Sequence, residues 1–174
     1  MSVSHTFAKD TSVPVARTRG EIDTLLRAWG CDGIAWADDY RARAVTLRFL
    51  WTRSEGEQYS ARLTLRFPSP AEVKARHAAE VQNRSRYVAP LADTEADRRA
   101  DQAARAGHRV LLLWIKAALN AVAAGLLTAE EVFLPHMEGS DGRTVAEVAL
   151  PRLRDLLTGA PASRLLPQGD TDAR

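Results

Sequence analysis

The longest uninterrupted helical pattern in the chain covers residues 93–125, where no proline breaks the spacing of the apolar positions. At about 100° of turn per residue, the apolar side chains of this segment fall on one side of a helix. That side carries Ala100, Ala104, Leu111, Trp114, Ile115, Ala118 and Val122. The opposite side carries Gln102 and a cationic stripe made of Arg98, Arg105, Arg109 and Lys116. The pattern therefore predicts one long amphipathic helix with a core face and a basic face.

An alternation with a period of two precedes this helix and predicts three antiparallel strands over residues 33–37, 41–52 and 57–67. The apolar face of the second and third strands consists of Val45, Leu47, Phe49, Trp51, Tyr59, Ala61, Leu63, Leu65 and Phe67. The other face carries Thr46, Arg48, Arg62, Thr64 and Arg66. Such alternation is typical of a sheet buried on one side only. The arginines of the polar face either keep the sheet soluble or form a second cationic surface.

Shorter helices are predicted by their end signals. The first covers residues 17–29 and stops at Gly30, and the second covers residues 71–83. The residues that open the later helices are Ser69 with Pro70, Thr128 with Glu131, and Thr144 with Glu147. We expect Pro151 to kink or divide the last helix, because proline cannot donate the backbone hydrogen bond that the helix requires.

These elements predict a single α+β domain over residues 16–158. In it, a three-stranded antiparallel sheet packs on the long amphipathic helix, with flanking N- and C-terminal helices. Residues 1–15 are expected to form a flexible N-terminal arm, and residues 159–174 a disordered C-terminal tail, because both are polar and contain proline without a period. Between the second helix and the long one, residues 84–92 are expected to form a loop that exposes Arg84 and Arg86.

The composition indicates one hydrophobic core of ordinary size and constrains the function little. The chain has 174 residues, a formal net charge of +2 and a pI near 9.0, so any attraction to polyanions must come from how the charges are arranged. Cys31 is the only cysteine, which excludes an intrachain disulfide. No signal-peptide pattern and no apolar run of membrane-spanning length is present. We therefore expect a soluble, cytoplasmic protein without membrane association.

Catalytic patterns are missing from the sequence. The four histidines have no metal-ligand spacing, and the glycines form neither a phosphate loop nor a nucleophile elbow. Asp38 and Asp39 are adjacent carboxylates, but they stand at a predicted hairpin turn, where aspartate accepts hydrogen bonds from nearby backbone amides. We expect no enzymatic activity, no cofactor and no metal site.

The cationic stripe is the strongest functional signal. Basic residues on one helix face attract a phosphate backbone without reading its sequence. The predicted nucleic-acid contacts are Arg98, Arg105, Arg109, Lys116, Arg48, Arg62, Arg66, Arg84 and Arg86. The same helix also carries acidic residues, and Asp101 stands four residues before Arg105, which leaves open a stripe that is merely a solvated, ion-paired surface.

Two segments resemble a known family: residues 11–30 (TSVPVARTRGEIDTLLRAWG) and residues 111–147 (LLLWIKAALNAVAAGLLTAEEVFLPHMEGSDGRTVAE). They are similar to short, uncharacterised proteins associated with phages and integrated mobile elements, and the order of the two blocks around a strand region also agrees. The resemblance implies a mobile-element context, in which small basic α+β proteins handle DNA or disarm a host protein. It brings no catalytic residues.

We therefore predict a sequence-independent nucleic-acid-binding accessory protein of phage or mobile-element replication or recombination, with single-stranded DNA as one candidate ligand. The alternative is a protein-binding module, such as a phage-encoded inhibitor or assembly factor. It would dock on a host or phage protein through an apolar patch around Leu112, Leu113 and the last helix. Association of the chain with itself stays open, as does an enzyme whose site is assembled from residues distant in sequence.

Overall fold

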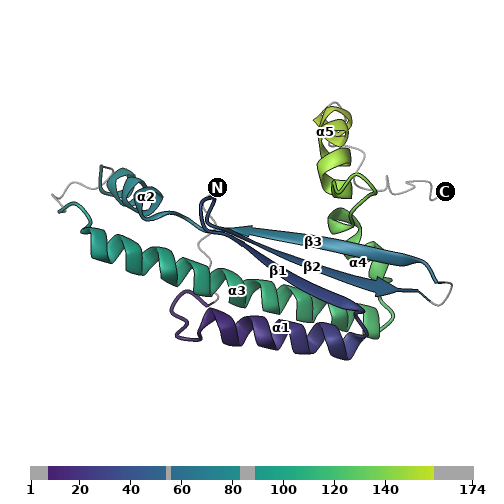
Figure 1. Cartoon of the computed structure of the whole chain (residues 1–174). Helices are drawn as coiled ribbons and strands as arrows, with labels where there is room; N and C mark the ends of the chain where they lie inside the picture. The colour runs from purple at the N-terminus through teal and green to yellow at the C-terminus, as the bar shows by residue number, and fades with distance from the viewer. Residues whose placement is uncertain (1–7, 54–55, 83–88, 159–174) are drawn as a thin grey trace, which may run out of the picture.

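The computed structural model describes residues 8–53, 56–82 and 89–158 and has the expected α+β architecture (Figure 1). Helices α1 and α3 lie side by side under one face of a three-stranded sheet, while α2 lies beyond one end of the sheet and α5 stands on the side of the sheet away from α1 and α3 (Figure 1). The predicted tail at residues 159–174, the loop residues Arg84 and Arg86, and residues 1–7 of the predicted arm lie outside the described residues.

The sheet is a meander of β1 (Gly33–Asp39), β2 (Ala44–Thr52) and β3 (Gln58–Arg66), with β2 in the middle. Its register pairs Trp36 with Leu47 and Leu47 with Leu63, so the apolar side chains of neighbouring strands share one face. On that face the buried residues are Val45, Leu47, Phe49, Trp51, Ala61 and Leu63. The predicted alternation and antiparallel order are confirmed.

Helix α1 (Val15–Trp29) ends at Gly30, whose φ of 105° is a left-handed conformation that glycine adopts without steric cost. Helix α3 (Asp93–Ala123) is the predicted long helix. It ends in a Schellman motif, in which Leu126 N–H donates to Ala121 O and Gly125 N–H to Val122 O. The buried residues of α3 are Ala96, Ala100, His108, Leu111, Leu112, Ile115, Ala118 and Leu119.

One residue of the predicted core face of α3 is exposed, while Ala104 and Val122 are half-buried. Trp114 is 37% exposed and lies at the edge of the core, where its ring meets Phe133 and His136 edge-on. Phe133 is fully buried and also contacts the rings of Phe49 and Trp51. This aromatic cluster fixes the C-terminal helices to the sheet.

The C-terminal segment contains α4 (Ala129–Phe133), the short 3-10 helix η1 (Leu134–His136) and α5 (Val145–Thr158). The predicted capping residues Thr128 and Glu131 form a reciprocal capping box. Between η1 and α5, Met137 pairs with Ala61, so this part of the chain lies along the free edge of β3. Helix α5 continues through Pro151 without being divided.

Helix α2 (Pro70–Gln82) folds back over the N-terminal part of α3, and none of its residues is fully buried. Ser69 opens the helix, since its hydroxyl accepts a hydrogen bond from the backbone N–H of Glu72 while the Glu72 carboxylate accepts one from Ser69 N–H. An ion pair between Lys74 and Asp93 joins α2 to the first turn of α3.

Candidate nucleic-acid interface

A hollow of about 940 Å³ lies between the end of β3, helix α2 and helix α3. We call it the α2–α3 groove. Its apolar lining comes from Leu65, Phe67, Pro68, Ala103, Ala106, Gly107 and Val110. The basic side chains that line it are Lys9, Arg66, Arg76, Arg98 and Arg99, against the acidic Asp10 and Glu72. The groove is thus an apolar floor with a mainly cationic border.

The local sequence positions each part of this border. Arg66 is the last residue of β3, and Pro68 prevents the strand from continuing. Arg76 lies on α2, which begins directly after this turn. Lys9 is brought to the groove by Gln102 on α3, whose side-chain amide donates to Lys9 O at 2.8 Å and to Thr11 O at 2.9 Å.

Gly107 lets the end of the sheet approach α3 closely. A Cβ at position 107 would stand 2.7 Å from Cε1 of Phe67, closer than real side chains come. The Phe67 ring stacks on the imidazole of His108, with 5.2 Å between ring centres. The floor of the groove at this point is therefore an aromatic ring held against the helix.

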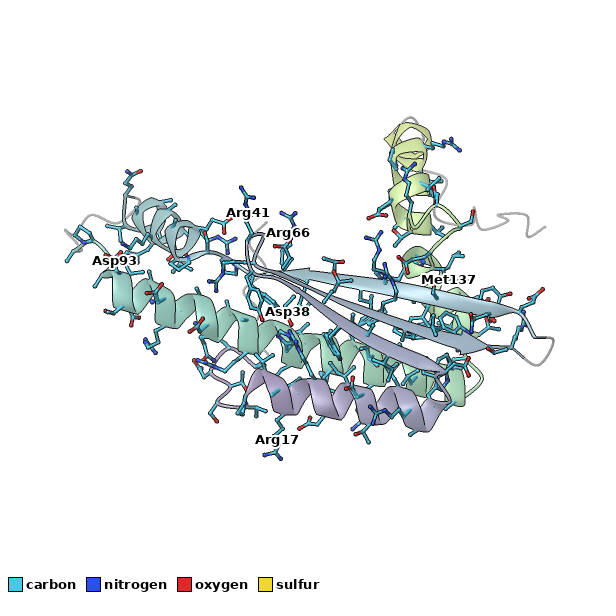
Figure 2. The ribbon with its side chains drawn as sticks, in the orientation of Figure 1. Arg17, Asp38, Arg41, Arg66, Asp93 and Met137 are labelled. Carbon is cyan, nitrogen blue, oxygen red and sulfur yellow. The ribbon has the colours of Figure 1, made fainter. Side chains whose placement is uncertain are left out.

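The β1–β2 turn adds a further arginine at the same end of the sheet. Ala44 pairs with Arg66, and Phe67 N–H donates to Arg43 O, so the turn lies beside the end of β3. Figure 2 shows Arg41 and Arg66 there, both directed away from the helix layer. Within the described residues, neither Arg41, Arg66 nor Arg76 forms an ion pair with a carboxylate.

Two carboxylates at or beside the groove border, Glu72 and Glu95, are already engaged. Glu72 accepts hydrogen bonds from the backbone and hydroxyl of Ser69, and these bonds are the main reason that its pKa is lowered. The positive charges of Arg76 and Arg66 lower it further. Glu95 accepts from both Arg98 and Arg99 at 2.7–2.8 Å, and these bonds lower its pKa to about 2. Arg98 and Arg99 thus share one carboxylate, which leaves positive charge in excess at the border of the groove.

The residues of the predicted cationic stripe on α3 do not share one surface but line three different hollows. Arg98 borders the α2–α3 groove. Arg105 donates to the Gln102 side chain at 2.6 Å and lines a smaller hollow beside residues 10–14. Arg109 donates to Glu21 of α1 at 2.6 Å, and Lys116 lies further along the same side of α3, so these two residues line a separate groove between α1 and α3.

The arginines of the outer sheet face meet the C-terminal segment. Arg48 donates two hydrogen bonds to the Glu138 carboxylate at 2.7 and 2.9 Å. Nε of Arg62 lies 3.1 Å from the same carboxylate without hydrogen-bond geometry, and its Nη2 donates to Glu147 at 2.6 Å. Of the predicted contacts, Arg66 and Arg98 are therefore brought together at one groove, while Arg48 and Arg62 are held in intramolecular ion pairs.

Sequence reasoning missed three residues of the groove border: Lys9, Arg76 and Arg99. Arg99 directly follows Arg98, so a helical projection of the sequence was enough to predict its position. Nothing local indicates that α2 folds back onto α3, which is what brings Arg76 to the groove. Lys9 comes from the segment that the pattern assigned to an arm, although residues 9 and 11 are bound by α3.

A polar cluster between α1, β1 and α3 was also missed. Arg19 donates to both carboxylate oxygens of Asp38 at 2.9 and 2.5 Å and lies over the Trp36 ring. Its Nε donates at 3.3 Å to Nε2 of His108, whose Nδ1 donates to Ala104 O at 2.8 Å. His108 is 2% exposed, and burial lowers its pKa, so the imidazole is neutral. The cluster joins three elements of the fold and opens onto none of the hollows described above.

Asp39, the other carboxylate of the predicted turn, accepts a hydrogen bond from Ala42 N–H at 2.7 Å, as its turn role requires. Burial raises the pKa of the Cys31 thiol to about 12, so this side chain is a neutral packing group at physiological pH. In the described ranges, no three potential metal ligands come together. No helix in those ranges has an apolar stretch long enough to cross a bilayer.

Scans against protein-family models, curated proteins and solved structures found no match to the chain. The site must therefore be interpreted from its own geometry and charge.

Proposed function

We propose that the chain binds nucleic acid without sequence preference, through the α2–α3 groove and the adjoining end of the sheet. The observation that carries this proposal is the gathering of Lys9, Arg66, Arg76, Arg98 and Arg99 around one groove. Arg66 and Arg76 have no carboxylate partner among the described residues, so their guanidinium groups can bind phosphate without first breaking an ion pair.

The shape of the groove favours a single strand over a duplex. Its floor includes the ring of Phe67, on which an unstacked base can stack, with the small apolar side chains of Val110 and the α3 alanines beside it. A duplex keeps its bases stacked inside and presents only phosphate and groove edges, so it would contact the basic border alone. Single strands would use the border and the floor together.

The biological setting that we propose, an accessory role in replication or recombination of a phage or mobile element, rests on the resemblance of residues 11–30 and 111–147. Binding that reads the backbone and not the sequence suits such a role, since the protein would have to follow any DNA that the element carries.

The test is fluorescence anisotropy with labelled single-stranded and double-stranded DNA over a salt series. The groove variant combines Arg66→Ala with Arg76→Ala. The matched control combines Arg27→Ala with Arg152→Ala, which removes the same charge from exposed positions on α1 and α5. Log affinity should fall linearly with log salt, with a slope of about 0.7 for each phosphate contacted on a single strand.

We expect the groove variant to weaken binding and to lower the salt slope by about 1.4, which corresponds to two lost contacts, whereas the control should follow the native protein. No binding of either DNA at low salt would remove the proposal. Equal binding by the groove variant and the control would show that DNA binds elsewhere on the chain.

A further inference from the structure

A second hollow, of about 540 Å³, lies between α1 and α3 and is distinct from the α2–α3 groove. We call it the α1–α3 groove. Its apolar floor comes from Leu25, Leu112 and Leu113, and its basic border from Arg17, Arg109 and Lys116. Leu113 is 45% exposed although it belongs to a helix whose neighbouring leucines are buried. The proposed nucleic-acid site leaves this surface unexplained.

The charge of the α1–α3 groove is one-sided. Its one acidic lining residue, Glu21, is shared by Arg17 at 3.4 Å and Arg109 at 2.6 Å. Along α3, the stretch from Gln102 to Ala123 contains basic residues but no aspartate or glutamate. A ligand that fits this groove must therefore bring both apolar groups for the floor and negative charge for the border.

Gly20 shows that the groove is kept open at its α1 side. Glycine is less favourable than alanine inside a helix, and Gly20 stands in the middle of α1 without a left-handed φ that would require it. A Cβ at this position would have no heavy atom within 4 Å, so internal packing does not require glycine either. Its effect is to leave room for a close approach of another chain beside Leu25 and Leu113.

We infer that the α1–α3 groove binds an acidic amphipathic helix of a partner protein. In this mode a helix places apolar side chains at spacings of three and four residues into a hydrophobic groove. The leucine floor would receive that face, while Arg17, Arg109 and Lys116 would meet glutamates or aspartates along its sides. The leucine side chains distinguish this site from a nucleic-acid surface, because aliphatic groups offer no planar ring for bases to stack on.

The test begins with selection of peptides from a random displayed library on the native full-length protein, with counter-selection on Gly20→Leu. The leucine would fill the groove without disturbing the fold, since position 20 faces empty space and leucine is a better helix former than glycine. A selected synthetic peptide is then measured by anisotropy against native protein, Gly20→Leu and Lys116→Glu, with Arg27→Glu as the charge-matched control.

We expect the enriched peptides to be acidic, with apolar residues at helical spacing, and to bind Gly20→Leu and Lys116→Glu at least tenfold more weakly than native protein. Thermal melting of Gly20→Leu should be unchanged or higher, and the Arg27→Glu control should bind as native protein does. Enrichment of peptides without this pattern, or equal binding to Gly20→Leu, would overturn the inference.

Two further measurements separate this site from the proposed nucleic-acid site. The Arg66→Ala, Arg76→Ala variant should bind the selected peptide as native protein does, whatever its effect on DNA. If Gly20→Leu instead weakens single-stranded DNA as much as it weakens the peptide, the groove is a general polyanion surface and the inference fails.

Discussion

Glu138 fixes the C-terminal segment to the outer face of the sheet. Removing its side chain tests how much this attachment stabilises the fold. Its backbone N–H donates to Ser60 O at 3.0 Å, and its carboxylate accepts two hydrogen bonds from Arg48. The same carboxylate lies 3.1 Å from Arg62. The Glu138 side chain is only 7% exposed, whereas that of Arg48 is 51% exposed.

The expected loss of stability on replacing Glu138 follows from these contacts. A hydrogen bond to a charged group contributes about 1.5–3 kcal/mol, but the exposed Arg48 would recover much of this from water once the carboxylate is gone. We therefore expect Glu138→Ala to lower the free energy of unfolding by about 2–3 kcal/mol. Glu138→Gln keeps one oxygen acceptor and should cost about 1 kcal/mol.

The assay is urea unfolding followed by tryptophan fluorescence, since three tryptophan rings pack on Phe133 just ahead of this segment. Combining Glu138→Ala with Arg48→Ala in a double-mutant cycle isolates the pair, and the coupling energy should exceed about 1 kcal/mol. The control is Asp101→Asn. That carboxylate is 69% exposed and 3.8 Å from Arg43, so its loss should cost less than about 0.5 kcal/mol.

Two results would refute this reasoning: a Glu138→Ala protein as stable as the control, or a cycle without coupling. The Glu138→Gln protein also tests whether Arg48 and Arg62 can contact nucleic acid once their shared carboxylate is neutral. If they can, single-stranded DNA should bind more tightly and with a steeper salt slope than to native protein. Unchanged binding would restrict the interface to the α2–α3 groove and the adjoining end of the sheet.

Three further predictions concern the groove and the polar cluster. Gly107→Ala should gain about 1 kcal/mol of helix stability only when Phe67→Ala has removed the clashing ring; denaturant unfolding that shows equal effects in both backgrounds would contradict the clash. Burial lowers the pKa of His108. Just below the ordinary histidine pKa of 6.5, the imidazole therefore takes up a proton in the unfolded chain but not in the folded one. Stability measured by unfolding should therefore fall as pH drops through that range, by up to about 1.4 kcal/mol per pH unit, and less steeply in His108→Gln; parallel profiles would exclude His108 as the source. Glu95→Gln should tighten single-stranded DNA binding by a small factor, about threefold, because it releases two arginines of the groove border; weaker binding in the anisotropy assay would contradict this.

The elements of the fold were predictable because their signals are local. The alternation from Val45 to Trp51 specifies one buried face, and the pairing of neighbouring strands follows from short turns. Helix ends were recognisable from single residues, such as Gly30 with its left-handed backbone and Thr128 with its capping box. Each of these signals depends on residues within a few positions along the chain, so no knowledge of tertiary structure was required.

The surroundings of the α3 stripe were less predictable, because a helical projection separates core from surface but does not identify the neighbours. Gln102 and Arg109 project away from the core face, yet Gln102 binds the backbone of residues 9 and 11, and Arg109 binds Glu21 of α1. The partner of Arg98, by contrast, was available from the sequence. Glu95 stands three residues earlier, which is ion-pair spacing on a helix.

Which charged groups the fold pairs with one another cannot be derived from local spacing alone. Arg48 and Glu138 are 90 residues apart, and Arg109 and Glu21 are 88 apart, so both pairs exist only through tertiary structure. The tertiary structure that pairs these arginines also brings Arg66 and Arg76 to one groove, without a carboxylate partner in the described part of the chain. A net charge of +2 for the whole chain is compatible with a mainly cationic groove border, because two acidic residues line this groove against five basic ones.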